Sequence, residues 1–130
     1  MPQYMLLIYS PADGRPSPDE MAAEMPKWYE FTEGLKDAGL YVAGDALNSV
    51  DSATTVRVRD GETQITDGPF AETKEQLGGY YLIDAPDLDT VLAQAARVPN
   101  VHYGSIEVRP VLDLSEAQAP AGQAQGQAAG

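Results

Sequence analysis

The spacing of apolar residues predicts a β-α-β unit in the first third of the chain. Residues 3–9 are mostly apolar and predict a buried strand. Residues 17–20 (Ser-Pro-Asp-Glu) carry the signals of a helix start, with Ser at the N-cap, Pro at the first helical position and Glu completing a capping box. Apolar side chains then recur every three or four residues up to Gly39, and residues 40–47 predict a second strand. Pro26 lies inside the helical pattern, so we expect a kink or two abutting helices near it.

A β-hairpin is the sharpest local signal, in residues 54–66. Asp60-Gly61 is a sequence typical of a two-residue hairpin turn. Counting outward from this turn pairs Arg59 with Glu62, and the next pairs place apolar residues on one face and polar residues on the other. We therefore predict two short antiparallel strands joined by a tight turn.

A second β-α-β unit follows the hairpin. Residues 80–85 predict a strand, Asp87 can cap a helix that ends at Pro99, and residues 105–111 alternate between apolar and polar side chains as the last strand. The order β-α-β, hairpin, β-α-β predicts an α+β fold. It matches a ferredoxin-like sandwich with an inserted β-hairpin, in which two helices cover one face of an antiparallel sheet.

The opposite face of such a sheet would stay uncovered in a single chain. It carries enough Tyr, Val and Ile to make contact with water unfavourable. A second sheet is the natural cover, so we expect a homodimer.

Composition divides the chain into a domain and a tail. The 130 residues suit one domain. Residues 1–114 hold all the predicted elements. Residues 115–130 are dominated by Ala, Gln and Gly and contain no branched apolar or aromatic side chain, which predicts a flexible tail because ordering it would bury little apolar surface.

The charged and metal-binding residue types exclude several classes of function. Eight Lys and Arg against 20 Asp and Glu give a net charge of −12, spread evenly along the domain, so neither nucleic acid nor an anionic membrane is expected as a partner. The chain has no Cys and one His, which removes thiolate nucleophiles, disulfides and multi-histidine metal centres. We predict no metal and no cofactor. No targeting segment is recognisable, so a cytoplasmic location is the default expectation.

Residues 66–79 form the most unusual loop in the sequence. Asp67-Gly68-Pro69 predicts a tight turn. Phe70 is an aromatic residue in a polar loop, and we expect it to anchor the loop on a core. Glu72, Lys74 and Glu75 then place two acids and one base within four residues.

This loop is where the chain resembles a known family. The motif Asp67-Gly68-Pro69-Phe70 resembles the signature of the DGPF group within the YCII-related domain proteins. Matching stretches flank it, at residues 54–57, 74–75, 78–81 and 107–110. The resemblance covers about residues 3–112, and it implies a bacterial protein whose ferredoxin-like protomer dimerises into an α/β barrel.

The same resemblance bears on function in two ways. Some family members are associated with extracytoplasmic-function sigma factors, which implies such a partner here. Other members carry a His–Asp pair proposed as catalytic, whereas His102 of this chain lies just before the last strand rather than near the first. That pair is therefore not transferred to this protein.

The remaining polar residues yield two overlapping sets of candidates. For acid–base catalysis the candidates are Asp67, Glu75, Glu107 and Arg109. For ligand binding beside the DGPF loop they are Asp67, Phe70, Glu72, Lys74, Tyr81 and Arg109. The alternative interpretation is structural: the loop residues are solvated with local ion pairs, and Glu107 and Arg109, two apart on one strand face, tie two protomers together.

The sequence is consistent with three functions. The leading hypothesis is a homodimer that encloses a small-molecule pocket beside the DGPF loop, with no reaction assigned. The first alternative is an enzyme that performs acid–base chemistry on a small polar substrate. The second is an accessory module that interacts with a sigma factor.

Overall fold

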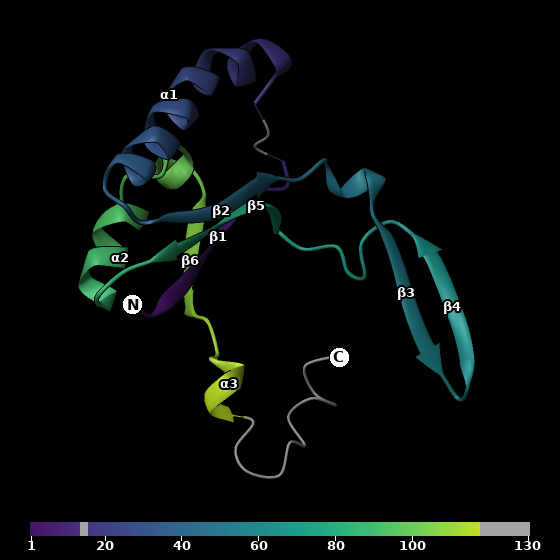
Figure 1. Cartoon of the computed structure of the whole chain (residues 1–130). Coiled ribbons are helices and arrows are strands. Elements are labelled where there is room, and N and C mark those ends of the chain that lie inside the picture. The colour runs from purple at the N-terminus through teal and green to yellow at the C-terminus, as the bar shows by residue number, and fades with distance from the viewer. Residues whose placement is uncertain (14–15, 118–130) are drawn as a thin grey trace.

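The two predicted β-α-β units form one antiparallel sheet with two helices (Figure 1). The computed structural model describes residues 1–13 and 16–117. The elements in chain order are β1 (Gln3–Pro11), α1 (Pro18–Asp37), β2 (Tyr41–Ala46), η1 (Val50–Ser52), β3 (Thr54–Arg59), β4 (Glu62–Asp67), β5 (Glu75–Asp84), α2 (Leu88–Ala95), η2 (Pro99–His102), β6 (Ser105–Pro110) and α3 (Leu114–Ala117). Within this part of the chain the main sheet has the order β2-β5-β1-β6, and each neighbouring pair is antiparallel.

Helix α1 begins as the sequence predicts. The Ser17 hydroxyl accepts a hydrogen bond from the Glu20 amide at 3.2 Å, and the Glu20 carboxylate accepts one from the Ser17 amide at 2.9 Å. The expectation of two abutting helices is wrong, because α1 is a single helix that contains Pro26. Pro26 and Ala22, whose carbonyl loses its intrahelical partner, are both exposed, so water can solvate that carbonyl.

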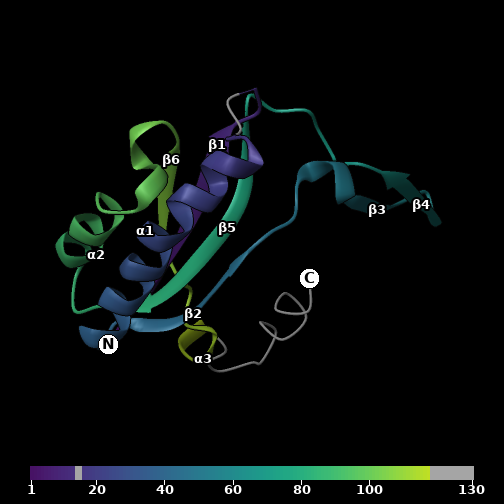
Figure 2. The same ribbon diagram turned by 90° about the horizontal axis from the view of Figure 1, so that it is seen from above.

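The core lies between the sheet and the two longer helices, which cover the same face (Figure 2). Leu6 of β1 and Ile83 of β5 are fully buried there against Leu35 of α1 and Val91 of α2. Trp28 is half-buried and packs on the edge of this cluster. The core therefore fixes α1 across the sheet and leaves the first turns of the helix free to overhang it.

Within residues 1–13 and 16–117, no helix covers the other face of the sheet, as predicted. Met5 and Leu7 of β1 and Leu82 of β5 point to it, since they alternate with the buried Leu6 and Ile83. All three side chains are half-buried. We call this surface the open face.

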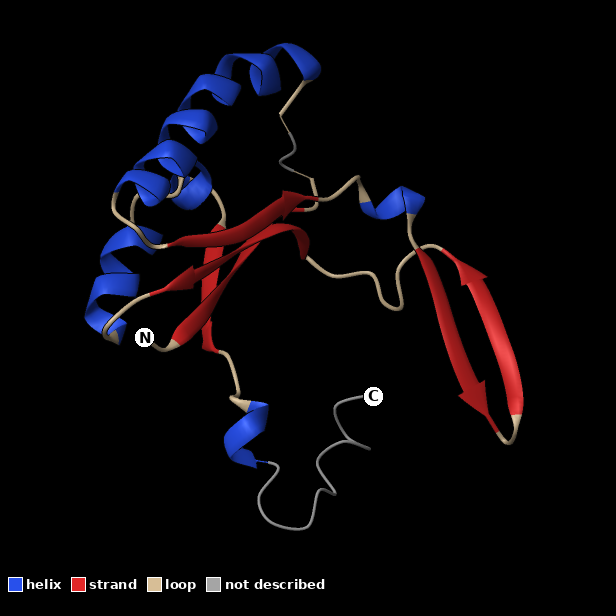
Figure 3. Cartoon of the chain, in the orientation of Figure 1, coloured by secondary structure: helices blue, strands red, loops and turns tan. Residues whose placement is uncertain are grey.

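The β3–β4 hairpin is confirmed in every predicted pair. Arg59 pairs with Glu62 and Val56 with Ile65, and both turn residues have positive φ, 53° at Asp60 and 78° at Gly61. The hairpin forms its own two-stranded sheet and extends away from the main sheet (Figure 3). Its apolar side chains consequently lie in the open, with Ile65 69% exposed.

Two boundaries differ from the sequence prediction. Strand β5 starts at Glu75 rather than at residue 80, because its first half pairs through the backbone with the end of β1, across a bulge between Ile8 and Tyr9. That half is polar and Gly-rich, so no apolar pattern marks it. The predicted tail begins with the short helix α3, and the prediction for 118–130 lies outside the described residues.

Candidate functional site

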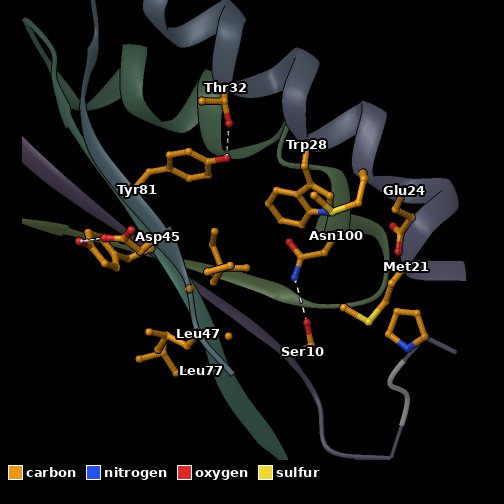
Figure 4. Close-up of a pocket in the computed structure, with 18 of the residues that line it drawn as sticks. Ser10, Met21, Glu24, Trp28, Thr32, Asp45, Leu47, Leu77, Tyr81 and Asn100 are labelled. Atoms are coloured by element: carbon orange, nitrogen blue, oxygen red, sulfur yellow. Dashed lines mark hydrogen bonds between the residues drawn. The ribbon is translucent and has the colours of Figure 1, made fainter. Parts of the chain in front are cut away.

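A cleft of about 520 Å³ lies between the first half of α1 and the sheet (Figure 4). Its size falls within the range of small-molecule sites, about 300–1,000 Å³. Met21, Met25 and Trp28 of α1 form much of one wall, and Leu47 and Leu77 lie on the opposite side. The cleft is therefore largely apolar, with polar groups at a few points.

Asn100 in η2 is the most deeply buried polar side chain of the cleft, at 1% exposure. Its Nδ2 donates to the backbone oxygen of Tyr9 at 3.1 Å and to the Ser10 hydroxyl at 3.2 Å. Its Oδ1 is buried and accepts no hydrogen bond from the described residues. This residue was missed in the sequence, because an Asn that follows a Pro in a loop is the ordinary composition of a turn.

Tyr81 of β5 and Thr32 of α1 also line the cleft, and a hydrogen bond between them joins the sheet to the helix. Their hydroxyls are hydrogen-bonded at 2.6 Å, and the Tyr81 ring packs edge-on against Phe31 with centroids 5.3 Å apart. Burial raises the pKa of Tyr81, an effect that the Thr32 hydrogen bond partly offsets. The phenol is thus held neutral and fixed in one orientation.

Tyr103 and Glu24 join the loop after η2 to the early turns of α1. The Tyr103 hydroxyl lies 3.1 Å from Oε1 and 3.0 Å from Oε2 of Glu24. Burial, followed by this hydrogen bond and the carboxylate charge, raises the pKa of Tyr103 to about 12. Both residues line the cleft, so a negative charge stands in its wall.

The DGPF segment lies elsewhere, at the base of the hairpin. The Gly68 amide donates to the Ala53 oxygen at 2.7 Å, and the Thr55 hydroxyl donates to the Gly68 oxygen at 2.8 Å. Phe70 is 73% exposed, so the expectation that it anchors the loop on a core is wrong for the single chain. The segment is attached to the hairpin through its backbone, and the hairpin stands apart from the core that Phe70 would need.

The other residues of the loop do not line the cleft either. Asp67 ends β4, and Glu72 and Lys74 are exposed in the connection to β5. Of the residues predicted to bind a ligand, the structure brings Tyr81 to the cleft and leaves Asp67, Phe70, Glu72, Lys74 and Arg109 outside it.

Three of the four catalytic candidates gather on the open face instead. Arg109 Nε lies 3.3 Å from Glu107 Oε2, and the Tyr9 hydroxyl donates to Glu107 at 3.4 Å. Ser105 belongs to β6, like Glu107 and Arg109, and its hydroxyl donates a hydrogen bond to Glu75 of β5 at 3.0 Å. Asp67 lies apart from this group, in the hairpin.

Two further features concern metals and membranes. Among residues 1–13 and 16–117, no group of three or more His, Asp or Glu side chains is arranged to hold a metal ion. In the same part of the chain, no helix is long and apolar enough to cross a membrane.

Comparison with known proteins places the chain in a family. The model of the YCII-related domain matches residues 2–115, so the chain belongs to the YCII-related family. It is also 53% identical over 62 residues to an uncharacterized protein of Rhizobium meliloti (strain 1021). This match covers 46% of the chain and 50% of the relative, so the chain spans about half the length of the curated relative that it matches.

Proposed function

We propose that the chain is a small-molecule-binding protein of the DGPF subgroup, which binds its ligand in the cleft between α1 and the sheet. The observation that carries the proposal is a cleft of about 520 Å³ with mostly apolar walls and a few polar groups, which are the buried Asn100 and the hydrogen-bonded hydroxyls of Tyr81 and the half-buried Thr32. The sequence analysis predicts a pocket beside the DGPF loop, which stays a prediction. The proposed cleft is lined by Gln76–Tyr81, a part of β5, the strand that follows this loop.

We propose further that the chain is a ferredoxin-like protomer of a dimeric α/β barrel. The two β-α-β units, the strand order β2-β5-β1-β6 and two helices on one face all support this classification. The half-buried Met5, Leu7 and Leu82 on the open face support association through that face. Asp67, Phe70, Glu72, Lys74 and Arg109 stay candidate ligand contacts for the assembled dimer.

The dimer is tested by sedimentation velocity of the full chain at micromolar concentrations. We expect a dimer for the wild type and a monomer for Leu7→Glu, which places a charge in the middle of the open face. Leu92→Glu is the matched control, because Leu92 is equally apolar and lies exposed on α2, and it should stay dimeric. A wild-type chain that sediments as a monomer would overturn the barrel.

Ligand binding is tested on the full chain purified without added ligand. We expect native mass spectrometry to show a co-purified small organic molecule. Unfolding and refolding the protein removes this molecule, and adding it back should change the fluorescence emission of Trp28. Trp28 is the only tryptophan and lines the cleft, so its emission reports on this site. If a bound molecule left Trp28 emission unchanged, or a broad set of fragments all failed to bind, the cleft would not be the functional site.

A second candidate function is acid–base chemistry on the open face. It is favoured by the cluster of Glu75, Glu107 and Arg109, which a partner sheet would enclose. Once a substrate screen finds turnover, Arg109→Gln and Glu107→Gln should abolish it while the melting temperature changes little, because both side chains are largely exposed. Full activity in both variants would exclude this assignment.

The proposed partner beyond a second copy is an extracytoplasmic-function sigma factor, in the cytoplasm. This proposal draws on the family resemblance, and the exposed Val56, Val58 and Ile65 of the hairpin are compatible with it. Co-purification of the wild-type chain with a sigma factor, lost when these three residues are changed to Ser, would support it. Equal recovery with both chains would exclude the hairpin as the contact.

A further inference from the structure

We infer that the cleft selects flat, apolar molecules that are neutral or cationic and carry an N–H or O–H group, which donates a hydrogen bond to Asn100 Oδ1. This inference rests on the proposed ligand binding in the cleft and specifies the chemistry of the ligand. It starts from one atom, the buried carbonyl oxygen that accepts no hydrogen bond from the described residues.

The orientation of the Asn100 amide is fixed by its neighbours. Nδ2 donates to the Tyr9 backbone oxygen at 3.1 Å, and a carbonyl oxygen can only accept. The reversed amide would bring two acceptors together, so Oδ1 has to face the other way. In Figure 4 the oxygen points to the Trp28 side of the cleft and the nitrogen points to Ser10.

The unpaired oxygen gives the site a preference for donors. A buried acceptor without a partner carries a desolvation penalty that a hydrogen bond removes. A ligand that donates to Oδ1 removes the penalty, whereas a ligand of the same shape without a donor leaves it in place. Sites built around buried polar groups discriminate in this way between a substrate and its analogue that lacks the hydrogen-bonding group.

The walls around Asn100 favour a flat apolar ring. Trp28 presents its indole beside the amide (Figure 4). Met21 and Met25, which lie nearer the start of α1, also line the cleft. Thioether side chains are flexible and repack easily around an aromatic ring, which opens a path to the buried oxygen. Aromatic stacking and one directed hydrogen bond would together set the orientation of the ligand.

The charges near the cleft disfavour an anion. Glu24 stands in the wall, and the one lining cation among the described residues, Lys36, lies 3.4 Å from Glu33 and above the Tyr41 ring. The whole chain carries a net charge of −12. An anionic ligand would meet repulsion without a free cation in the cleft to offset it.

The test compares two probes that differ in one atom. Indole carries an N–H group, and benzofuran has the same shape with an oxygen in its place. Each is titrated into the full chain and followed by ¹H–¹⁵N NMR at the Asn100 side-chain amide and the Trp28 indole, with affinities from calorimetry. We expect both signals to shift with indole, and indole to bind about fivefold or more tightly than benzofuran, the effect of one hydrogen bond.

Two variants locate the origin of this preference. Asn100→Leu should reduce the affinity ratio of indole to benzofuran to about one. Thr32→Val is the matched control, because it removes a polar group from the same cleft and keeps Asn100, so the ratio should persist whatever the absolute affinities. If Asn100→Leu does not fold, the wild-type probe pair decides the question without it.

The outcomes separate this inference from the function on which it rests. Equal or stronger binding of benzofuran, with shifts at Trp28, would overturn the donor preference and leave the cleft as a binding site. If neither probe shifted Trp28 or Asn100 at millimolar concentration, both the inference and the proposed function would be overturned. If a folded Asn100→Leu variant still bound indole more tightly than benzofuran by the wild-type ratio, the role of Oδ1 would also be overturned.

Discussion

At the scale of single residues, Tyr103 and Glu24 form the contact that joins the loop after η2 to the overhanging part of α1. Their hydrogen bond exists only while the phenol is protonated, because a phenolate would face the carboxylate as a second negative charge. The pKa of Tyr103 is raised to about 12, by burial first and by Glu24 next. The contact is therefore intact at all physiological pH values.

A pH titration tests this pair. The folded pKa of Tyr103 lies above the unfolded value near 10, so its stabilising effect is complete below pH ~10 and disappears as the pH rises toward 12. We expect the difference in the free energy of unfolding between wild type and Tyr103→Phe to be constant below pH ~10 and to shrink above it. Guanidinium denaturation at a series of pH values measures this difference.

The control for this prediction is Glu24→Gln. It removes the carboxylate and keeps a hydrogen-bond acceptor, so the pKa of Tyr103, followed by NMR of the labelled ring, should fall part of the way toward its ordinary value. Burial is the larger cause of the shift, so the pKa of Tyr103 would still lie above the ordinary value of a tyrosine. An unchanged pKa in Glu24→Gln would show that the carboxylate does not act on Tyr103.

At the scale of elements, two adjacent glycines of β5 have different roles. A Cβ atom at Gly79 would lie 2.8 Å from the Asp45 backbone oxygen of β2, closer than side chains tolerate. A Cβ atom at Gly78 would meet only the Ile8 oxygen, at 3.9 Å, an ordinary contact. Of these two glycines, only Gly79 is therefore required by the close approach of β2 to β5.

Alanine substitutions at these two positions form a matched pair. Gly79→Ala should lower the free energy of unfolding by about 1–3 kcal/mol, because the strands must separate or strain to admit the methyl group. Gly78→Ala should change it by less than about 1 kcal/mol, since space is available and Ala restricts the unfolded chain. Denaturant unfolding of both variants measures the two values, and equal values would contradict the close contact at Gly79.

At the scale of the whole molecule, net charge and the open face act against each other. Each chain carries a charge of −12, so two copies repel at long range. The apolar side chains of the open face, Met5, Leu7 and Leu82, favour association at short range. The proposed dimer must overcome the first effect through the second.

Added salt should therefore strengthen the dimer. The screening length falls from about 30 Å at 10 mM to about 8 Å at 150 mM salt, which removes most of the repulsion and leaves apolar burial unaffected. We expect sedimentation equilibrium to give a lower dissociation constant at 150 mM than at 10 mM sodium chloride. A dimer that weakened with salt would instead indicate that charge pairs, with Glu107 and Arg109 as the first candidates, hold the interface.

The sequence predicted most of the fold for reasons that are local. The cap at Ser17, the turn at Asp60-Gly61, the apolar run of β1 and the apolar alternation of β6 each depend on residues close together in the chain. The first half of β5 was missed because its pairing with β1 is made by backbone atoms, which leave no mark in the side-chain pattern. Pro26 does not divide α1 into two helices, since the helix continues through it.

The candidate site was harder to predict. The DGPF motif drew attention to Phe70 and its neighbours, yet the single chain holds them at the base of an outlying hairpin. Asn100 gave no signal, because its importance comes from contacts with Tyr9 and Ser10, some 90 residues away in the chain. Tyr81 was the one predicted ligand-binding residue that the structure places in the cleft.

What the amino-acid order fixes here is the set of elements and the face each one buries, because helix caps, turns and apolar periodicity act over a few residues. The cleft has another origin. It exists because α1 crosses the sheet and overhangs the ends of β1, β2 and β5, which brings Trp28, Tyr81 and Asn100 from three distant segments to one place. Burial and hydrogen-bond partners are properties of that assembly, so the unpaired oxygen of Asn100 becomes visible only once the chain is folded.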